Sequence, residues 1–300
     1  MFAQLGSTDS ITVKKMRKIL HHSKVVRVLT MLNRLKAEEY FTQNTRSQYL
    51  GSNKLLCQIL GQFKLFVPGN DVGLAPHLIF DGFWEFWLTK FFADHVKLGD
   101  TVIDVGANLG YYSVLSADLV GPGGRVIAVE PNPAIFALLA DSMRVNGFDT
   151  RSELCNIALG GQEDAATLPF FVPNGEPKNG RFIGPKENIE RLRQLGEISE
   201  VKTGTLDALG LERVDFIKID VEGAEIAVLD QLAPLIARFE PVVVCEVNFG
   251  RGYGYNDIAK RLGRNGVLKY LDFYNKIHTL TAEMIQAQQV NDDWLVVANV

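Results

Sequence analysis

From residue 101 onward, short apolar runs alternate with segments in which apolar residues recur at helical spacing. The apolar runs, which predict strands, cover residues 101–107, 125–131, 153–159, 214–222 and 241–248. The segments between them, which predict helices, include residues 111–120, 133–146 and 224–232. Strands that alternate with helices imply a mostly parallel sheet covered on both faces. The pattern therefore predicts an α/β, Rossmann-like fold, and two further apolar runs near the carboxyl terminus predict an antiparallel edge pair.

Other segments precede or interrupt this alternation of predicted strands and helices. Residues 1–62 predict a helical extension, because apolar residues recur there at helical spacing among many lysines and arginines. Residues 63–300 are expected to form the main domain, which includes an aromatic helix over 80–96 that carries Glu85. Residues 160–205, rich in turn residues and charge, predict an insertion or lid within that domain.

The basic amino-terminal segment allows two interpretations. Between Lys14 and Arg46 its only acidic residues are Glu38 and Glu39, and its apolar residues form a stripe. A basic amphipathic helix can bind a membrane surface or a partner. Such stripes more often serve packing. We therefore expect helices that pack on the domain or on a second subunit, which is consistent with a homodimer.

Composition narrows the class of protein. The 300 residues are 47% hydrophobic and 22% charged, as in a globular protein. A net charge of −4 provides no basic field, so we expect no nucleic-acid partner. The cysteines Cys57, Cys155 and Cys245 form no CxxC pair and suit a reducing cytosol. The sequence shows neither the apolar core of a secretory signal nor an uncharged run that could span a bilayer, so we expect a soluble, cytoplasmic protein.

A glycine-rich loop follows the first strand of the alternating region. It runs Asp104-Val-Gly106-Ala107-Asn108-Leu-Gly110 and leads directly into a predicted helix. Glycines allow a sharp turn and the close approach of a ligand to the backbone. The free N–H groups at the start of the helix favour an anionic group such as a carboxylate. In a Rossmann-like sheet this loop is the binding corner.

Glu130 indicates which kind of ligand this corner binds. It ends the next strand, about 20 residues after the loop, where an acidic side chain accepts hydrogen bonds from ribose hydroxyls. The loop and Glu130 together predict a nucleoside-containing cofactor. A dinucleotide fingerprint needs G-x-G-x-x-G, but Asn108 and Tyr111 occupy its second and third glycine positions. A cofactor that carries an amino acid fits better, and an NAD-type protein is the alternative.

Carboxylates follow at the ends of the next two strands. Lys218, Asp220 and Glu222 share one side of their strand, because successive side chains alternate. Buried ionisable groups are costly unless they are paired or used, and ligands bind at the carboxyl ends of such strands. We interpret Asp220 and Glu222 as functional, although an ion pair with Lys218 would also explain them. Glu246 ends the following strand and could act directly or support its neighbours.

The quoted segments resemble the FkbM-type family of S-adenosylmethionine-dependent methyltransferases. The resemblance rests on DTVIDVGANLGYYSVLSA, RVIAVEPNP, NIALG and VDFIKIDVEGAE, in that order, and on an upstream GFWEFW with Gly82 and Glu85. It covers roughly residues 63–246, weakly over the insertion. It implies S-adenosylmethionine as the cofactor and a class I methyltransferase sheet of seven strands, the last antiparallel.

The resemblance also implies roles for single residues. Those implied around the cofactor are Glu85, Asp104, Gly106, Ala107, Asn108, Gly110, Tyr111, Glu130, Pro131, Asn132, Asn156, Ala158 and Asp220. Glu130 would hold the ribose hydroxyls, Asp220 would lie beside the sulfonium, and Glu85 near the methionine amino group. Either Tyr111 or Tyr112 would face the cofactor.

The expected activity is O-methylation of a hydroxyl on a small-molecule acceptor, such as a glycan or a natural product. Positioning can lower the barrier of such an in-line displacement by ~7–11 kcal/mol, and a general base adds ~10²–10⁴-fold. We expect Asp220 or Glu222 to be that base, with Glu246 third. A divalent metal on Asp220, Glu246 and Asn248 is an alternative, but no metal motif supports it, so no metal is predicted.

Two further expectations concern the alternatives and the acceptor. A non-catalytic protein could retain this fold, but the intact Asp104, Gly106, Glu130 and Asp220 argue against a decayed site. Acceptor specificity is expected in the 160–205 insertion and in the loop at 250–255, both interpreted as lids.

Overall fold

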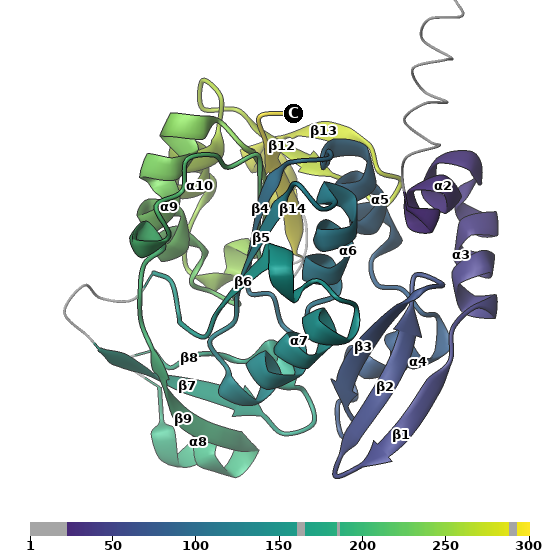
Figure 1. Ribbon diagram of the computed structural model, residues 1–300. Coiled ribbons are helices and arrows are strands. Elements are labelled where there is room, and N and C mark those ends of the chain that lie inside the picture. The colour runs from purple at the N-terminus through teal and green to yellow at the C-terminus, as the bar shows by residue number, and fades with distance from the viewer. Residues whose placement is uncertain (1–22, 161–165, 185–186, 288–292) are drawn as a thin grey trace, which may run out of the picture.

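The central sheet lies between two layers of helices (Figure 1). The structure is a computed structural model, and it describes residues 23–160, 166–184, 187–287 and 293–300. Within these ranges, eight strands form the sheet in the order β13-β12-β14-β11-β10-β4-β5-β6. In chain order they are β4 (Thr101–Val105), β5 (Arg125–Val129), β6 (Ser152–Cys155), β10 (Phe216–Ile219), β11 (Val242–Val247), β12 (Leu268–Leu271), β13 (Ile277–Leu280) and β14 (Trp294–Ala298).

Strand directions confirm the predicted α/β fold with a mostly parallel sheet. Strands β4, β5, β6, β10 and β11 pair in parallel. Strand β14 pairs antiparallel with β11 on one side and with β12 on the other. The predicted antiparallel pairing of the two tail segments is confirmed for β12 and β14, but their predicted position at the edge is wrong, because β14 lies inside the sheet. The edge is taken by β13, which forms a hairpin with β12 and adds an eighth strand to the seven implied by the resemblance.

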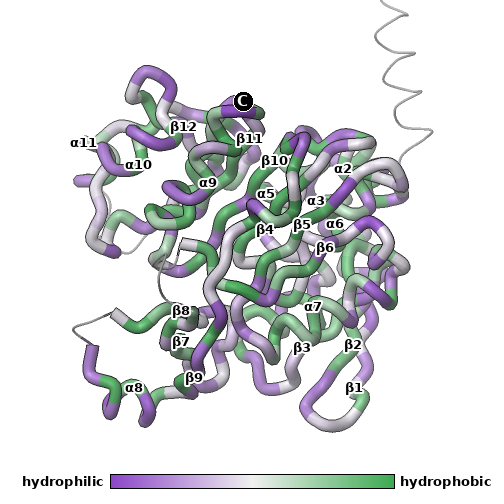
Figure 2. The backbone as a smooth tube through the Cα atoms, turned by 60° about the vertical axis from the view of Figure 1, so that its left-hand side comes forward, coloured by the Kyte–Doolittle hydropathy of each residue, from purple (hydrophilic) through white to green (hydrophobic). Residues whose placement is uncertain are grey.

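Each central strand contributes to two hydrophobic cores, because its side chains alternate. Val102 and Phe216 join the core on one face, and Ile103 and Ile217 join the core on the other. The first face is covered by α5 (Phe86–His95), α6 (Tyr111–Val120) and α7 (Pro133–Val145), and the second by α9 (Glu225–Phe239) and α10 (Tyr255–Leu262). Figure 2 shows how hydrophobic the central strands are. By the same alternation, Asp104 and Lys218 point to the face that α5 and α6 cover.

The amino-terminal part differs from the helical extension predicted over 1–62. Helices α2 (Lys24–Met31) and α3 (Arg34–Gln43) are followed by an antiparallel sheet of β1 (Ser47–Gly51), β2 (Lys54–Ile59) and β3 (Phe63–Pro68). The chain turns back at Ser52-Asn53 and at Leu60-Gly61, where the backbone adopts positive φ. Because the chain reverses at these turns, the segments on either side pair as antiparallel strands. Helix α4 (Ala75–Phe80) then leads to α5, and the part of the predicted extension at 1–22 lies outside the described residues.

The predicted insertion forms a small layer of its own. Strands β7 (Thr167–Pro173), β8 (Arg181–Phe182) and β9 (Gly196–Lys202) pair antiparallel, and α8 (Ile189–Leu195) precedes β9. Residues 161–165 and 185–186 of the insertion lie outside the described residues. A short helix, α11 (Ala282–Ala287), links β13 to the last strand region. In the part of the chain that is described, no helix combines the length and apolar character needed to cross a bilayer.

Candidate cofactor-binding and active site

A cavity of about 680 Å³ opens at the carboxyl ends of the central parallel strands. This volume falls within the range of about 300–1,000 Å³ that small-molecule sites occupy. Residues predicted from the sequence that line it are Glu85, Gly106, Ala107, Asn108, Tyr111, Glu130, Pro131, Ala158, Asp220, Glu222 and Glu246. The structure therefore brings together residues from β4, β5, β10 and β11 and from the loop before α5.

The glycine-rich loop packs directly on the end of β10. Gly106 adopts a φ of 75°, and a Cβ atom there would lie 1.8 Å from the carbonyl oxygen of Asp220. Gly110 adopts a φ of 91° as α6 begins, and a Cβ atom there would lie 2.5 Å from Leu139 Cδ1. Asn108 between them also has a positive φ, of 51°. Only glycine fits at Gly106, because any side chain would displace the strand end that carries Asp220.

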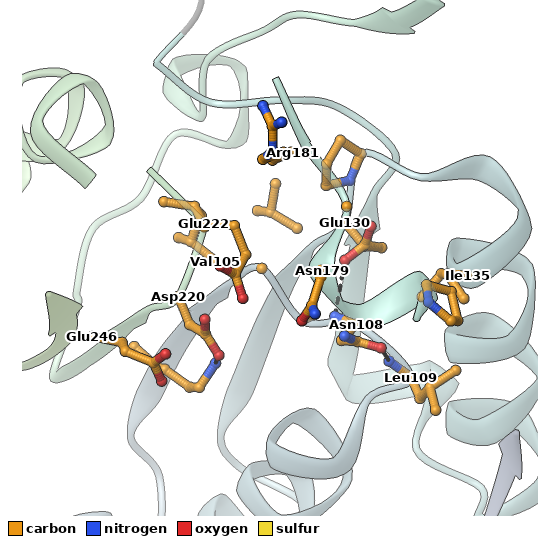
Figure 3. A pocket seen from close by; sticks show the side chains of 18 of the residues that line it. Val105, Asn108, Leu109, Glu130, Ile135, Asn179, Arg181, Asp220, Glu222 and Glu246 are labelled. Carbon is orange, nitrogen blue, oxygen red and sulfur yellow. Dashed lines mark hydrogen bonds and ion pairs between the residues drawn. The ribbon is translucent and has the colours of Figure 1, made fainter. Parts of the chain in front are cut away.

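Glu130 is fixed by the backbone around it. Its Oε2 accepts a hydrogen bond from the N–H of Asn108 at 2.9 Å, and its Oε1 accepts one from the N–H of Asn132 at 2.8 Å. An ionised carboxylate has further acceptor sites beyond these two, and Figure 3 shows the carboxylate at the wall of the cavity. Burial raises the pKa of Glu130 to about 7. The group is therefore an oriented acceptor for hydroxyl donors.

Four predicted residues do not line the cavity but support residues that do. Asn156 Nδ2 donates to the carbonyl oxygens of Glu130 and Pro131, at 2.8 and 3.1 Å. Asn132 caps α7, where its side chain accepts from the N–H groups of the first turn. The remaining two are Asp104, buried below the cavity floor, and Gly110, at the start of α6.

A buried cation lies between two carboxylates under the cavity. Lys218 is 4% exposed, and its Nζ lies 3.0 Å from Asp220 Oδ2 and 3.8 Å from Asp104 Oδ1. Ser113 Oγ donates to Asp104 Oδ2 at 2.6 Å. Burial alone would lower the pKa of Lys218, but the charges of Asp220 and Asp104 outweigh it and raise that pKa above its usual value. The ion pair between Lys218 and Asp220, which the sequence left as an alternative explanation of the carboxylates, is present, and Asp104 also takes part in it.

Three carboxylates gather at the end of the cavity farthest from Glu130 (Figure 3). Asp220, Glu222 and Glu246 each place one oxygen within 4.8 Å of the others. Glu222, which has a φ of 53°, forms a short ion pair with Arg251. The pKa of Glu246 is raised well above its usual value, mainly by the charge of Asp220 and then by burial. The three acids therefore differ, because Lys218 and Arg251 pair with two of them.

Asn248, the third ligand of the metal site considered from the sequence, is engaged in other contacts. Asn248 Nδ2 donates to Asp293 Oδ1 at 2.9 Å, and Asn248 Oδ1 accepts from the N–H of Gly250. Its side chain therefore serves the loop after β11. The three carboxylates could hold a divalent cation by their spacing, but Lys218 and Arg251 already supply positive charge there.

Glu85 approaches the cavity from the loop before α5. It has a φ of 38°, and its Oε2 accepts a hydrogen bond from Tyr112 Oη at 2.8 Å. Tyr111 Oη lies 2.9 Å from Thr89 Oγ1. Both tyrosines line the cavity. Either tyrosine is therefore placed where it can face a ligand.

Several lining residues were not predicted individually. The insertion contributes Asn179 and Arg181, and the guanidinium of Arg181 donates to both carboxylate oxygens of Glu187, at 2.7 and 2.8 Å. The loop after β11 contributes Arg251, and Asp293 precedes the last strand. The sequence predicted that the insertion and the loop after β11 lie over the strand ends. Nothing in its pattern distinguished Arg181, Arg251 and Asp293 from ordinary surface charges.

The cavity fits a ligand that is a nucleoside at one end and a charged amino acid at the other. Glu130 suits ribose hydroxyls, Gly106 lets the backbone approach the ligand, and Glu85 and Asp220 suit positive groups. These properties match S-adenosylmethionine, and fold and site together define a class I S-adenosylmethionine-dependent methyltransferase.

Comparison with known proteins identifies the family. The family described as Methyltransferase FkbM domain matches residues 104–286, so the chain belongs to the FkbM family of methyltransferases. Methyltransferase sdnD of Sordaria araneosa is 28% identical over 178 residues, which are 48% of this chain and 67% of that protein. The 31-O-demethyl-FK506 methyltransferase FkbM of Streptomyces tacrolimicus is 28% identical over 156 residues, 45% of this chain and 60% of that protein.

Two further similarities are to other methyltransferases. A protein-L-isoaspartate O-methyltransferase of Aeropyrum pernix is 46% identical over 111 residues, 36% of this chain and 40% of that protein. A crystal structure of methyltransferase FkbM from Methylobacillus flagellatus aligns with a TM-score of 0.34 and 15% identity, covering 54% of this chain and 42% of that one. The family assignment rests on the family model, not on this structural alignment.

Proposed function

We propose that this methyltransferase transfers the methyl group to a hydroxyl oxygen of a small-molecule acceptor, such as a glycan or a natural product. The observation that carries the proposal is the acidic end of the cavity, formed by Asp220, Glu222 and Glu246. A hydroxyl is neutral and must lose a proton during the transfer, so a carboxylate beside it is useful. A carboxylate acceptor would be repelled at the same place, because like charges at short range are unfavourable.

We propose a different role for each of the three carboxylates. When bound, S-adenosylmethionine supplies a methyl group on a positively charged sulfur. Asp220, held by Lys218, provides a fixed negative charge. Glu222, held by Arg251, keeps the loop after β11 over the cavity. Glu246 makes none of the ion pairs found among the described residues, and its raised pKa makes its ionised form a stronger base. We therefore place Glu246 ahead of Asp220 and Glu222 as the group that removes the hydroxyl proton.

Amide substitutions test this division. In Glu246→Gln, kcat should fall by about 10²–10⁴-fold, while the Kd for S-adenosylmethionine measured by calorimetry changes little. Asp220→Asn should weaken cofactor binding as well. The exposed Glu197→Gln on β9 is a matched control that should keep full activity. Full turnover in Glu246→Gln, in Asp220→Asn and in a third variant, Glu222→Gln, would refute a general-base role for this cluster.

The bond formed tests the acceptor class. With methyl-labelled cofactor and a panel of hydroxylated sugars and macrocyclic alcohols, the product of this proposal is an ether, which withstands mild base. A methyl ester would release labelled methanol under the same treatment. Label released by base from every product would overturn the assignment of a hydroxyl acceptor.

A further inference from the structure

An exposed apolar patch lies on the outside of the molecule, at the junction of two segments far apart in the chain. Its members, which we call the corner patch, are Met31, Leu35, Phe273 and Tyr274, exposed by 68%, 76%, 65% and 78%. The first two flank the break between α2 and α3, and the other two form the turn between β12 and β13. Large apolar side chains gathered at one exposed place indicate an interaction surface.

Defined contacts hold the two halves of the corner patch together. Arg34 Nη1 donates to the carbonyl oxygen of Phe273 at 2.7 Å. The ring of Phe273 packs edge-on against Trp87 of α5, with centroids 4.6 Å apart. Figure 1 shows α2 and α5 neighbouring each other on this side of the molecule. The patch is therefore a built surface, because a polar contact and a ring contact fix the turn against the helices.

Packing accounts for only part of the apolar stripe that the sequence shows. Val25, Val28 and Leu29 are buried, which confirms the predicted packing role for the first turns of the stripe. Leu32 and Leu35 continue the stripe but are exposed by 37% and 76%, and Met31, at the end of α2, is exposed beside them. These residues leave apolar surface that the described part of the fold does not cover.

Charge around the corner patch points to an anionic partner. Residues 23–37, which carry one half of the patch, hold four lysines and arginines and no aspartate or glutamate, although acidic residues outnumber basic ones 35 to 31 over the whole chain. Arg27 and Lys36 are exposed on α2 and α3, and Lys276 is exposed next to the turn. Basic side chains beside exposed aliphatic and aromatic ones are typical of segments that bind the surface of a bilayer with anionic lipids.

The corner patch also lies close to the acidic end of the cavity. Leu271, at the end of β12, and Glu246, on β11, pair with the same residue of β14, Leu295. Neighbouring strands are about 4.8 Å apart, so the turn begins about two strand spacings from Glu246. Trp87, which contacts Phe273, follows Glu85 of the cavity wall by two residues. A surface bound at the patch would thus lie beside the cavity.

We propose that the corner patch and its basic surround dock the protein on a bilayer containing anionic phospholipids. Met31, Leu35, Phe273 and Tyr274 insert among the headgroups, while Arg27, Lys36 and Lys276 contact the negative lipid surface. Each basic side chain near such a surface strengthens binding roughly fivefold, and salt screens this part. The homodimer predicted from the sequence would use the same helices and is the rival occupant.

Vesicle sedimentation of the full chain tests the proposal. The protein should sediment with vesicles of phosphatidylcholine and phosphatidylserine, but not with phosphatidylcholine alone, and high salt should release it. Binding should fall at least about tenfold in the double variant Phe273→Ser/Tyr274→Ser and in Lys36→Glu/Lys276→Glu. Matched controls are Val72→Ser, an equally exposed apolar residue beside the insertion, and Lys202→Glu on β9, and both should bind as the unchanged protein does.

Other results of the same experiments would overturn bilayer docking at the corner patch. Equal sedimentation with both vesicle types, or undiminished binding by the patch variants, would overturn the proposal. Analytical ultracentrifugation separates the rival: a dimer that dissociates in Phe273→Ser/Tyr274→Ser, together with no vesicle binding, would assign the patch to a second copy. The changed residues are exposed, and Phe273→Ser also removes the ring contact with Trp87, so the unfolding temperature of that variant should fall only slightly and those of the others should stay unchanged, which shows that the variants are folded. The result does not depend on the proposed acceptor, because no turnover is measured.

Discussion

Removing the buried cation between Asp104 and Asp220 should destabilise the protein in a pH-dependent way. Lys218→Met keeps the length of the side chain but leaves two carboxylates at 3.0 and 3.8 Å from the position of the lost charge. Asp104 is fully buried, and its Oδ1 accepts no hydrogen bond within the described residues. Breaking a buried ion pair by removing one partner typically costs about 3–5 kcal/mol. We expect that loss in the free energy of unfolding near pH 7.

Acidification should reduce the loss. Burial already raises the pKa of Asp104 in the folded state, and removal of Lys218 must raise it further. A carboxyl whose folded-state pKa exceeds the unfolded value of about 3.9 binds its proton more tightly when folded. Its unfavourable effect is therefore absent below about pH 3.9, grows between that value and the folded-state pKa by at most about 1.4 kcal/mol per pH unit, and stays constant at higher pH.

Urea denaturation of both proteins at about pH 5 and about pH 8 measures this difference. The double variant Lys218→Met/Asp104→Asn should recover much of the stability, because the amide carries no buried charge. A destabilisation below about 1 kcal/mol, or one that stays the same at the two pH values, would refute the reasoning. In that case water or a shifted neighbour must solvate the two carboxylates.

Three further outcomes are expected. Because the pKa of Glu130 is about 7 and its ionised form accepts ribose hydroxyls better, the affinity for S-adenosylmethionine should rise from about pH 6 to about pH 8. Calorimetry should find weaker binding without that pH dependence in Glu130→Gln, and a parallel dependence in the variant would contradict it. Gly106→Ala places a Cβ 1.8 Å from the Asp220 carbonyl oxygen at a φ of 75°, so it should abolish cofactor binding and lower the melting temperature. The control is Gly147→Ala, because a Cβ there meets nothing within 4 Å at a similar φ of 71° and tests the backbone strain alone. Treatment with EDTA should leave turnover unchanged, because Lys218 and Arg251 already neutralise the acidic end; lost activity that Mg²⁺ restores would favour the metal alternative.

The sequence predicted the parallel strands and the cavity corner well, because both depend on local pattern. A run such as residues 101–107 is apolar on both faces, and its glycines mark the turn into the helix. The amino-terminal strands were missed, although Gly51-Ser52-Asn53 is a turn signal, because Ser47–Gly51 is largely exposed and lacks the apolar alternation of a half-buried strand. The place of β14 inside the sheet depends on contacts with β11 and β12, which no local pattern encodes.

The site residues show the same division. Asp220 and Glu130 could be predicted, because each ends a strand at a place where ligands bind. Arg181 and Asp293 could not, since segments without a regular period bring them to the cavity. The proposed ranking of Asp220, Glu222 and Glu246 as candidate bases also required the structure, because it depends on which of them Lys218 and Arg251 reach.

Three residues of the cavity wall, Glu85, Asn108 and Glu222, hold their backbones in the left-handed region, with φ of 38°, 51° and 53°. For a residue with a side chain this conformation costs roughly 1–2 kcal/mol, and glycine would relieve it. Selection for heat resistance alone should therefore favour glycine at Glu85 and Glu222, which would remove the side chains that the cavity presents. At these positions a substitution that raises thermal stability should lower activity. A more heat-resistant form that keeps its activity should gain its stability elsewhere, most readily in the exposed strand β1.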